Sequence, residues 1–235
     1  MRRHREPRTL ADGASVLDRM ALILATRGID QATVDALPDD AESYSALEAL
    51  SAGVPPRYRD AVAEHPQVLA WARQVAAQAV SPSLGARRQA ATGPSLLMAG
   101  VVGAGKTYQA YGAVRVLVQA GIGVRWRATT AADLYAELRP GSDTDSERVL
   151  AAYSRVPVLI LDDLGAAKSS EFVEEQTYRL INRRYNHMLP TLITTNLPIG
   201  ALKAYLGDRV ASRLAQMTTR VEFEPVDRRR LQRAA

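Results

Sequence analysis

The chain contains no cysteine, which excludes disulfide bonds and zinc sites with cysteine ligands. It also lacks any apolar run of about 18 residues, the length that a membrane-spanning helix needs. The short apolar stretch at residues 20–25 has no small-residue cleavage site of the kind that ends a signal peptide. From these absences we expect a cytoplasmic protein that makes no use of a membrane. With 235 residues, 47% of them hydrophobic, the chain can bury one substantial core and carry a small appendage.

The positive charge is concentrated at the two ends of the chain. The formal net charge is +5, to which residues 1–8 contribute +3 and residues 228–235 contribute +4, so that residues 9–227 carry −2. Short basic segments attract phosphates or acidic partners over about a Debye length, but they are equally typical of solvated chain ends. The basic composition is therefore weak evidence for nucleic-acid binding.

The clearest functional signal is the octapeptide Gly-Val-Val-Gly-Ala-Gly-Lys-Thr at residues 100–107. It fits the phosphate-binding loop G-x-x-x-x-G-K-[ST] at every fixed position, and it lies between a predicted buried strand, 95–99, and a predicted helix, 106–120. In such a loop the backbone N–H groups surround phosphate oxygens, the lysine reaches the β- and γ-phosphates, and the threonine hydroxyl binds Mg²⁺. The predicted nucleotide-binding residues are Gly100, Val101, Val102, Gly103, Ala104, Gly105, Lys106 and Thr107.

Two further apolar runs end in polar residues that suit the same site. Residues 158–161 are followed by Asp162 and Asp163, and residues 191–195 are followed by Asn196. Because ligands of open α/β sheets bind at the carboxyl ends of the strands, we expect these side chains to meet around one nucleotide. Asp162 would hold Mg²⁺ through water, Asp163 would polarise the attacking water, and Asn196 would hydrogen-bond the γ-phosphate or that water.

Two arginines four residues apart, Arg209 and Arg213, share one face of a predicted helix. Arg213 is a candidate arginine finger, a side chain that one copy of the chain supplies to the γ-phosphate of its neighbour, with Arg209 beside it. The alternative is that both belong to an ordinary solvated helix face.

The alternation of strands with helices predicts an α/β fold of the P-loop NTPase type, a parallel sheet flanked by helices. We expect three segments. Residues 1–50 form a helical amino-terminal region with a basic arm, which docks on the ATPase body or on a partner. Residues 51–225 form the ATPase domain, and residues 226–235 form a basic tail. No helical lid domain is evident after residue 223.

Taken in this order, the motifs resemble the DnaC/IstB-like branch of the AAA+ ATPases. The resemblance runs from about residue 52 to residue 223 and includes residues 52–58, 130–134 and 212–214 besides the motifs above. It implies ATP rather than GTP as the nucleotide, with adenine near residues 54–58, including Tyr58. It also implies that Asn196 is the sensor 1 residue, that Arg213 acts in trans, and that the helix near 131–139 faces single-stranded DNA.

The chain departs from that family at two places. Asp163 stands where most AAA+ proteins have glutamate, and the shorter side chain should activate water less well. The carboxy-terminal Ser-Tyr-Arg segment of the family is replaced by residues 226–230, Val-Asp-Arg-Arg-Arg. We therefore expect slow hydrolysis, controlled by partners.

The leading hypothesis is an ATP-dependent helicase loader of bacterial or phage DNA replication. Such a protein binds and hydrolyses ATP, self-associates into a ring or spiral, and places a replicative DNA helicase on single-stranded DNA. One alternative is a transposition helper ATPase of the IstB type, which shares every motif but wraps duplex DNA. The other is a nucleotide-gated adaptor that binds ATP and hardly hydrolyses it.

Overall fold

The computed structural model describes residues 40–141 and 145–226, with the backbone alone for residues 40–45. The chain divides into two compact units, Met1–Glu42 and Ser43–Ala235, and the fold given below is that of the second. The predictions for residues 1–39, including a helix from about residue 15, lie outside the described residues. So do the predictions for the basic tail beyond residue 226.

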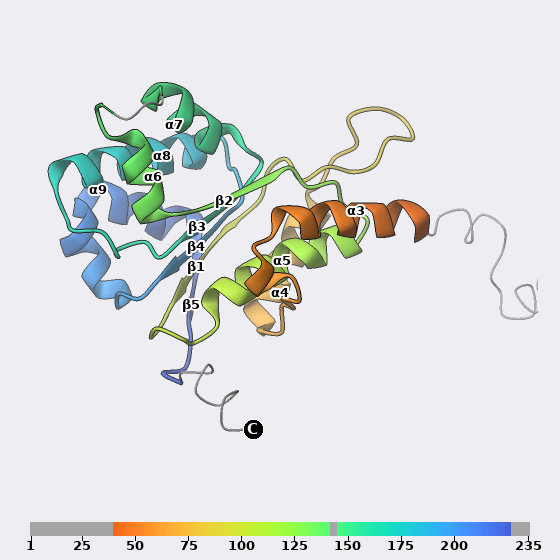
Figure 1. Ribbon diagram of the computed structural model, residues 1–235, viewed down its shortest axis with the longest axis horizontal. Helices are drawn as coiled ribbons and strands as arrows, with labels where there is room; N and C mark the ends of the chain where they lie inside the picture. Colours follow the sequence, from red (N-terminus) through yellow and green to blue (C-terminus); the bar gives the residue numbers. More distant parts are fainter. Residues whose placement is uncertain (1–39, 142–144, 227–235) are drawn as a thin grey trace, which may run out of the picture. The chain divides into compact units, whose positions relative to one another are not determined.

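A sheet of five parallel strands forms the centre of the described part (Figure 1). The strands are β1 Ser95–Ala99, β2 Trp126–Thr130, β3 Val158–Asp162, β4 Thr191–Thr195 and β5 Thr218–Glu222. Their order across the sheet is β2-β3-β4-β1-β5. The phosphate-loop strand β1 therefore has β4 and β5 as its neighbours, and β3 lies next to β4. Parallel neighbours need crossover connections, which is why helices alternate with the strands along the chain.

Helices cover both faces of this sheet (Figure 1). One face is covered by α3 Asp40–Gly53, α4 Pro66–Ala77 and α5 Lys106–Gln119; the other is covered by α6 Ala131–Leu138, α7 Ser146–Arg155, α8 Glu171–Asn186 and α9 Leu202–Met217. Two short 3₁₀ turns, η1 Pro56–Tyr58 and η2 Ile199–Ala201, complete the described elements. The predicted parallel sheet between two helical layers is confirmed.

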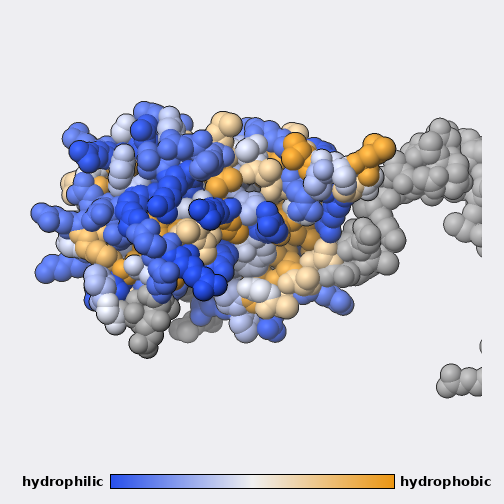
Figure 2. Space-filling view, turned by 90° about the horizontal axis from the view of Figure 1, so that it is seen from above, coloured by the Kyte–Doolittle hydropathy of each residue, from blue (hydrophilic) through white to orange (hydrophobic). Residues whose placement is uncertain are grey.

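The central strands β1, β3 and β4 are almost completely buried, and their sequences are mainly apolar because both faces of the sheet are covered there. In β1, Leu96 and Met98 pack with α4 and α5, whereas Leu97 packs with the layer of α6 to α9. On the surface shown in Figure 2, hydrophilic residues predominate and the apolar ones form separate patches. Among the described helices, none combines the length and the apolar composition that crossing a membrane requires.

Short polar side chains fix where several helices begin. Thr130 accepts a hydrogen bond from the backbone N–H of Asp133 at the start of α6, and Ser170 accepts one from Val173 at the start of α8. Asp145 caps α7 through two backbone N–H groups. These caps satisfy N–H groups that have no partner within the helix, and they place each helix start just after a strand or loop. By contrast, α5 begins at Lys106 with no capping side chain.

Helix α5 packs directly on the backbone of the segment before α4. The side-chain oxygen of Gln109 accepts hydrogen bonds from the backbone N–H groups of Glu64 and His65, at 2.9 and 3.0 Å. One turn further along, Gly112 lies so close to this segment that a Cβ atom on it would be 2.3 Å from the backbone nitrogen of Ala63. A glycine is therefore required in the middle of a helix.

We expect Gly112→Ala to lower the free energy of unfolding. Helix propensity alone would make this change favourable by about 1 kcal/mol, but the clash with backbone atoms cannot be relieved by a side-chain rotation. Overpacking of this kind costs about 1–3 kcal/mol, so the net effect should be a loss. Gly200→Ala is the matched control, because a Cβ there meets nothing within 4 Å. Urea unfolding of both variants checks the prediction, and equal midpoints would contradict it.

Candidate functional site

The predicted phosphate loop connects β1 to α5 at the carboxyl edge of the sheet. The backbone N–H of Gly100 donates to the carbonyl oxygen of Thr195 at 3.3 Å, which joins the start of the loop to the end of β4. Gly105 precedes the helix with φ 93°, a left-handed conformation that glycine adopts without strain. The first N–H groups of α5, which no side chain caps, are suited to bind an anion.

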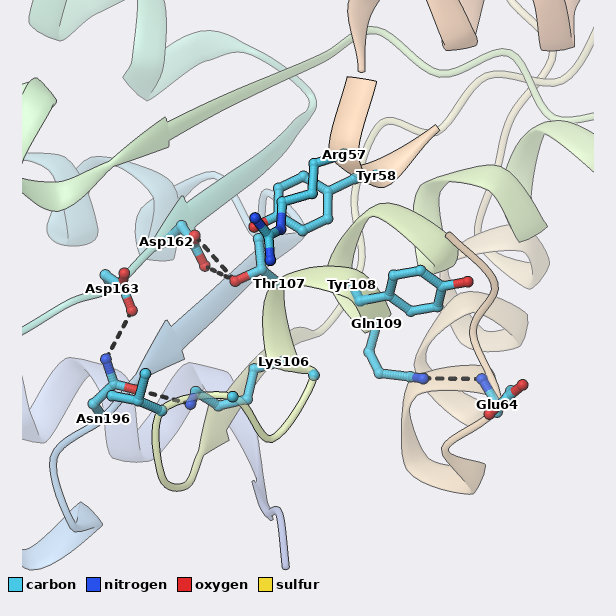
Figure 3. Close-up of a pocket in the computed structure, with 13 residues that line it drawn as sticks. Arg57, Tyr58, Glu64, Lys106, Thr107, Tyr108, Gln109, Asp162, Asp163 and Asn196 are labelled. Atoms are coloured by element: carbon cyan, nitrogen blue, oxygen red, sulfur yellow. Dashed lines mark hydrogen bonds between the residues drawn. The ribbon is translucent and has the colours of Figure 1, made fainter. Parts of the chain in front are cut away.

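Lys106 links this loop to the neighbouring strand (Figure 3). Its Nζ donates to the carbonyl oxygens of Gly100 and Val101, at 2.8 and 2.9 Å, and to Oδ1 of Asn196 at 2.8 Å. Although it is charged, the residue is only 5% exposed. The ammonium group is therefore held between the loop and Asn196, and in a phosphate loop this group would reach the β- and γ-phosphates.

Thr107 and Asp162 lie side by side on the other side of the loop (Figure 3). The Thr107 hydroxyl donates to Oδ1 of Asp162 at 2.9 Å, and the Thr194 hydroxyl donates to the same oxygen at 2.5 Å. Burial raises the pKa of Asp162 above its ordinary value; the two hydroxyl groups and Lys106 oppose that shift, whereas the charge of Asp163 adds to it. The carboxylate is thus partly buried, and both of its oxygens accept from neighbouring hydroxyl groups.

This pair of oxygens fits Mg²⁺ bound together with a nucleotide. Mg²⁺ usually binds one or two protein oxygens and completes its shell with water and substrate phosphates. Among the described residues, no group of three or more histidine or acidic side chains could hold a metal alone. Thr107 and Asp162 would therefore hold the ion, as predicted, and the ion would neutralise phosphate charge.

Asp163 and Asn196 form the third part of the site. The side-chain nitrogen of Asn196 donates to Oδ1 of Asp163 at 2.9 Å, while its oxygen accepts from Lys106. Asp163 has φ 53°, which is unusual for a residue other than glycine, and its backbone N–H is held by the Thr194 hydroxyl at 2.9 Å. Such strained positions are found where the surrounding structure fixes a functional side chain. A line of ammonium, amide and carboxylate groups thus runs from the loop to the ends of β3 and β4.

These groups line one cavity of about 500 Å³, a volume typical of small-molecule sites (Figure 3). Of the loop residues, Val102, Gly103, Gly105, Lys106 and Thr107 line it. Gly100 and Val101 do not line the cavity, but their carbonyl groups accept hydrogen bonds from Lys106, and Ala104 is buried in the core. Asp162, Asp163 and Asn196 complete the set that the sequence predicted.

The cavity also has a wall that the sequence analysis did not identify residue by residue. It comprises Arg57, Glu64, Tyr108 and Gln109, together with the predicted Tyr58. Val54, which was expected near adenine with Tyr58, is 5% exposed and belongs to the hydrophobic core. The motif at residues 52–58 predicted part of this wall, but no sequence pattern indicated that Glu64 or Gln109 would line the cavity.

The two predicted finger residues lie on α9 and do not line this cavity. Nε of Arg213 donates to Oδ1 of Asn182 at 3.2 Å, and its guanidinium carbon lies 4.5 Å from the centre of the Tyr185 ring. Arg209 is exposed. This position agrees with a role in trans, because an arginine finger lies outside the cavity of its own chain. The role itself stays a prediction.

Replacing Asp162 with asparagine should stabilise the nucleotide-free protein while removing Mg²⁺-dependent nucleotide binding. The pKa of Asp162 is raised in the folded state. When the pH rises above the ordinary pKa of aspartate, the folded chain therefore keeps more protons than the unfolded chain does. The free energy of unfolding falls over this pH range. A neutral amide avoids this loss, and its oxygen can still accept from Thr107 and Thr194.

Thermal unfolding without nucleotide, measured at several pH values, checks this prediction. Asp162→Asn should melt above the wild type at neutral pH, and the difference should shrink in acid, where the carboxylate is protonated as well. A variant that melts below the wild type at neutral pH would contradict it.

Comparisons with known proteins show what the chain is similar to. The family model described as IstB-like ATP binding protein matches residues 73–221. The replicative helicase loader DnaC of Escherichia coli K12 is 27% identical over 123 residues, which are 51% of this chain and 49% of that protein. The chain thus spans about half the length of the curated relatives it matches.

Solved structures show the same fold. A crystal structure of the DnaC helicase loader superposes with a TM-score of 0.57 at 25% identity, covering 72% of this chain and all of that one. A crystal structure of DnaI superposes with a TM-score of 0.55 at 22% identity, covering 78% of this chain and 92% of that one.

Proposed function

Because the chain belongs to the IstB-like ATP-binding proteins, within the DnaC/IstB-like branch of the AAA+ ATPases, we propose that it is an ATP-dependent loader of a replicative helicase. In this proposal, ATP binding drives self-association into a ring or spiral that holds the helicase on single-stranded DNA. Hydrolysis then releases the helicase. DnaC, named above, is a helicase loader, and its activity extends to this chain as part of the proposal.

The observation that carries the proposal is the line of hydrogen bonds from Lys106 through Asn196 to Asp163. A γ-phosphate that approaches the loop would meet the ammonium and amide groups first, with the carboxylate behind them. Lys106 can then exchange its bond to Oδ1 of Asn196 for one to the phosphate, and the amide nitrogen of Asn196 can donate to the phosphate in place of Asp163. These exchanges would make the site sensitive to the presence of that phosphate. Asp163 would polarise a water molecule for attack.

The proposed assembly places Arg213, with Arg209 beside it, at the γ-phosphate of the neighbouring copy. Arginine fingers contribute about 10³–10⁵ to turnover where this has been measured. Helix α6, Ala131–Leu138, would face single-stranded DNA. Residues of α6 and of the preceding strand β2, including Arg127, are exposed and would be accessible to the DNA.

The test is the mass of the complex formed with a replicative helicase and a single-stranded oligonucleotide, measured with ATP and with ADP. We expect a large assembly with ATP that dissociates as ATP is hydrolysed. Arg213→Ala should bind ATP but fail to assemble or to hydrolyse it. If ATP is bound and no assembly forms with any partner, the loader proposal is wrong although the nucleotide site is correct.

A transposition helper ATPase of the IstB type is the second candidate, because the IstB-like family model covers more of the chain than the sequence similarity to DnaC does. ATP-dependent binding to duplex DNA in preference to single strands would favour this candidate. Binding without turnover under every condition would instead favour a nucleotide-gated adaptor, for which the short side chain of Asp163 gives a physical reason.

A further inference from the structure

A second cationic side chain, Arg57, enters the nucleotide cavity from the wall opposite Asn196 (Figure 3). It lies on η1, whose two prolines restrict the backbone before it. The turn is closed by hydrogen bonds from the N–H of Tyr58 to the carbonyl of Pro55 at 2.8 Å and from the N–H of Ala61 to the carbonyl of Tyr58 at 3.0 Å. Arg57 is therefore presented by a rigid turn.

Stacking of Tyr58 on α5 fixes the position of this turn relative to the phosphate loop. The Tyr58 and Tyr111 rings are 5.0 Å apart and nearly parallel, at 16°. Tyr111 follows Thr107 by four residues, so the two side chains share one face of α5. Figure 3 accordingly shows the Arg57 side chain beside Thr107, on the side of the cavity where Asp162 lies and away from Glu64.

The two cations of the cavity are in different situations. Lys106 is buried and holds the loop through hydrogen bonds to Gly100, Val101 and Asn196. Arg57 is exposed to solvent, and its guanidinium makes no hydrogen bond or ion pair with any residue that the structure describes. A planar guanidinium with several N–H donors matches phosphate oxygens better than any other side chain.

We propose that Arg57 binds the β- and γ-phosphate end of the nucleotide from within the same chain. This inference rests on the proposed nucleotide site and adds a residue to it. Mg²⁺ at Thr107 and Asp162 would take one set of phosphate oxygens, and Arg57 would donate to oxygens on the solvent side that the glycine loop leaves free. The residue acts by binding and orienting the triphosphate, and it does not depend on a neighbouring copy.

Calorimetric titration with Mg²⁺–ATP and with Mg²⁺–ADP tests the proposal. For Arg57→Ala we expect ATP affinity to fall by about tenfold or more, as for the loss of a charged hydrogen bond, and ADP affinity to fall much less. Arg57→Lys should restore part of the ATP affinity, because it keeps the charge and loses the planar fork. Arg59→Ala is the matched control, since Arg59 is also exposed, lies two residues away and does not line the cavity.

The outcomes are distinct. Unchanged ATP affinity in Arg57→Ala would overturn the proposal, and so would an equal loss for ATP and ADP, which would place the guanidinium away from the terminal phosphate. Melting temperatures of the nucleotide-free variants exclude a folding defect, because an exposed side chain without partners should not change them. If the wild type binds neither nucleotide, the proposed function itself fails.

Discussion

Lys106→Ala is expected to abolish measurable ATP hydrolysis and to weaken ATP binding by about 100-fold or more, which corresponds to the loss of at least one strong charge-assisted contact. The ammonium group is the buried cation of the site, and it also ties Gly100 and Val101 to Asn196. Its removal therefore takes away a phosphate ligand and loosens the loop that presents the others. Nucleotide titration and phosphate release measure the two effects.

Lys203→Ala is the control for this substitution. It removes the same charge from an exposed position on α9, where Lys203 pairs only with Asp208 at the surface. The control should bind and hydrolyse ATP as the wild type does. If Lys106→Ala kept wild-type ATP affinity, the assignment of residues 100–107 as the phosphate loop would have to be abandoned.

Arg184→Ala should cause the largest loss of stability of any single substitution considered for this chain, about 3–5 kcal/mol. The guanidinium is completely buried at the amino-terminal edge of the sheet. It donates to the Thr191 hydroxyl at 2.8 Å and to four backbone carbonyl groups, those of Tyr153, Val156, Pro157 and Pro190. Truncation removes all of these hydrogen bonds and leaves a large cavity in their place.

The adjacent Arg183 provides the comparison. Its side chain is 41% exposed and lies 3.9 Å from Glu147, a surface pair that contributes little. Arg183→Ala should change the unfolding free energy by about 0.5 kcal/mol or less, and both variants can be measured by urea unfolding. Similar losses for the two neighbouring arginines would show that the buried carbonyl contacts do not stabilise the fold.

Strands β1, β3 and β4 and the main site residues could be predicted because each carries a local signal. Runs such as 158–161 are apolar throughout, the phosphate loop has a fixed spacing, and both carboxylates follow a strand directly. Asn196 was found by the same reasoning. These features depend on residues close together in the sequence, and parallel α/β topology then determines that the strand ends meet.

The features that were missed depend on contacts between distant segments. Strand β5 was not predicted, because it lies at the edge of the sheet and only Val221 among its five residues is buried. The role of Gln109 as acceptor for Glu64 and His65 joins residues more than 40 positions apart. Arg184 looked like one of many arginines on a helix. Its burial is visible only when the starts of β3 and β4 are placed around it.

Arg184 also connects α8 to the two strands that lead to the candidate site. Its hydrogen bonds join α8 to the segments just before β3 and β4. At their opposite ends, β3 carries Asp162 and β4 leads into Asn196. Arg213 is in turn attached to α8 through Asn182 and Tyr185. In the proposed assembly, a shift of β3 or β4 on nucleotide binding would be transmitted through α8 to Arg213. Nucleotide binding in one subunit would then change its contact with the next.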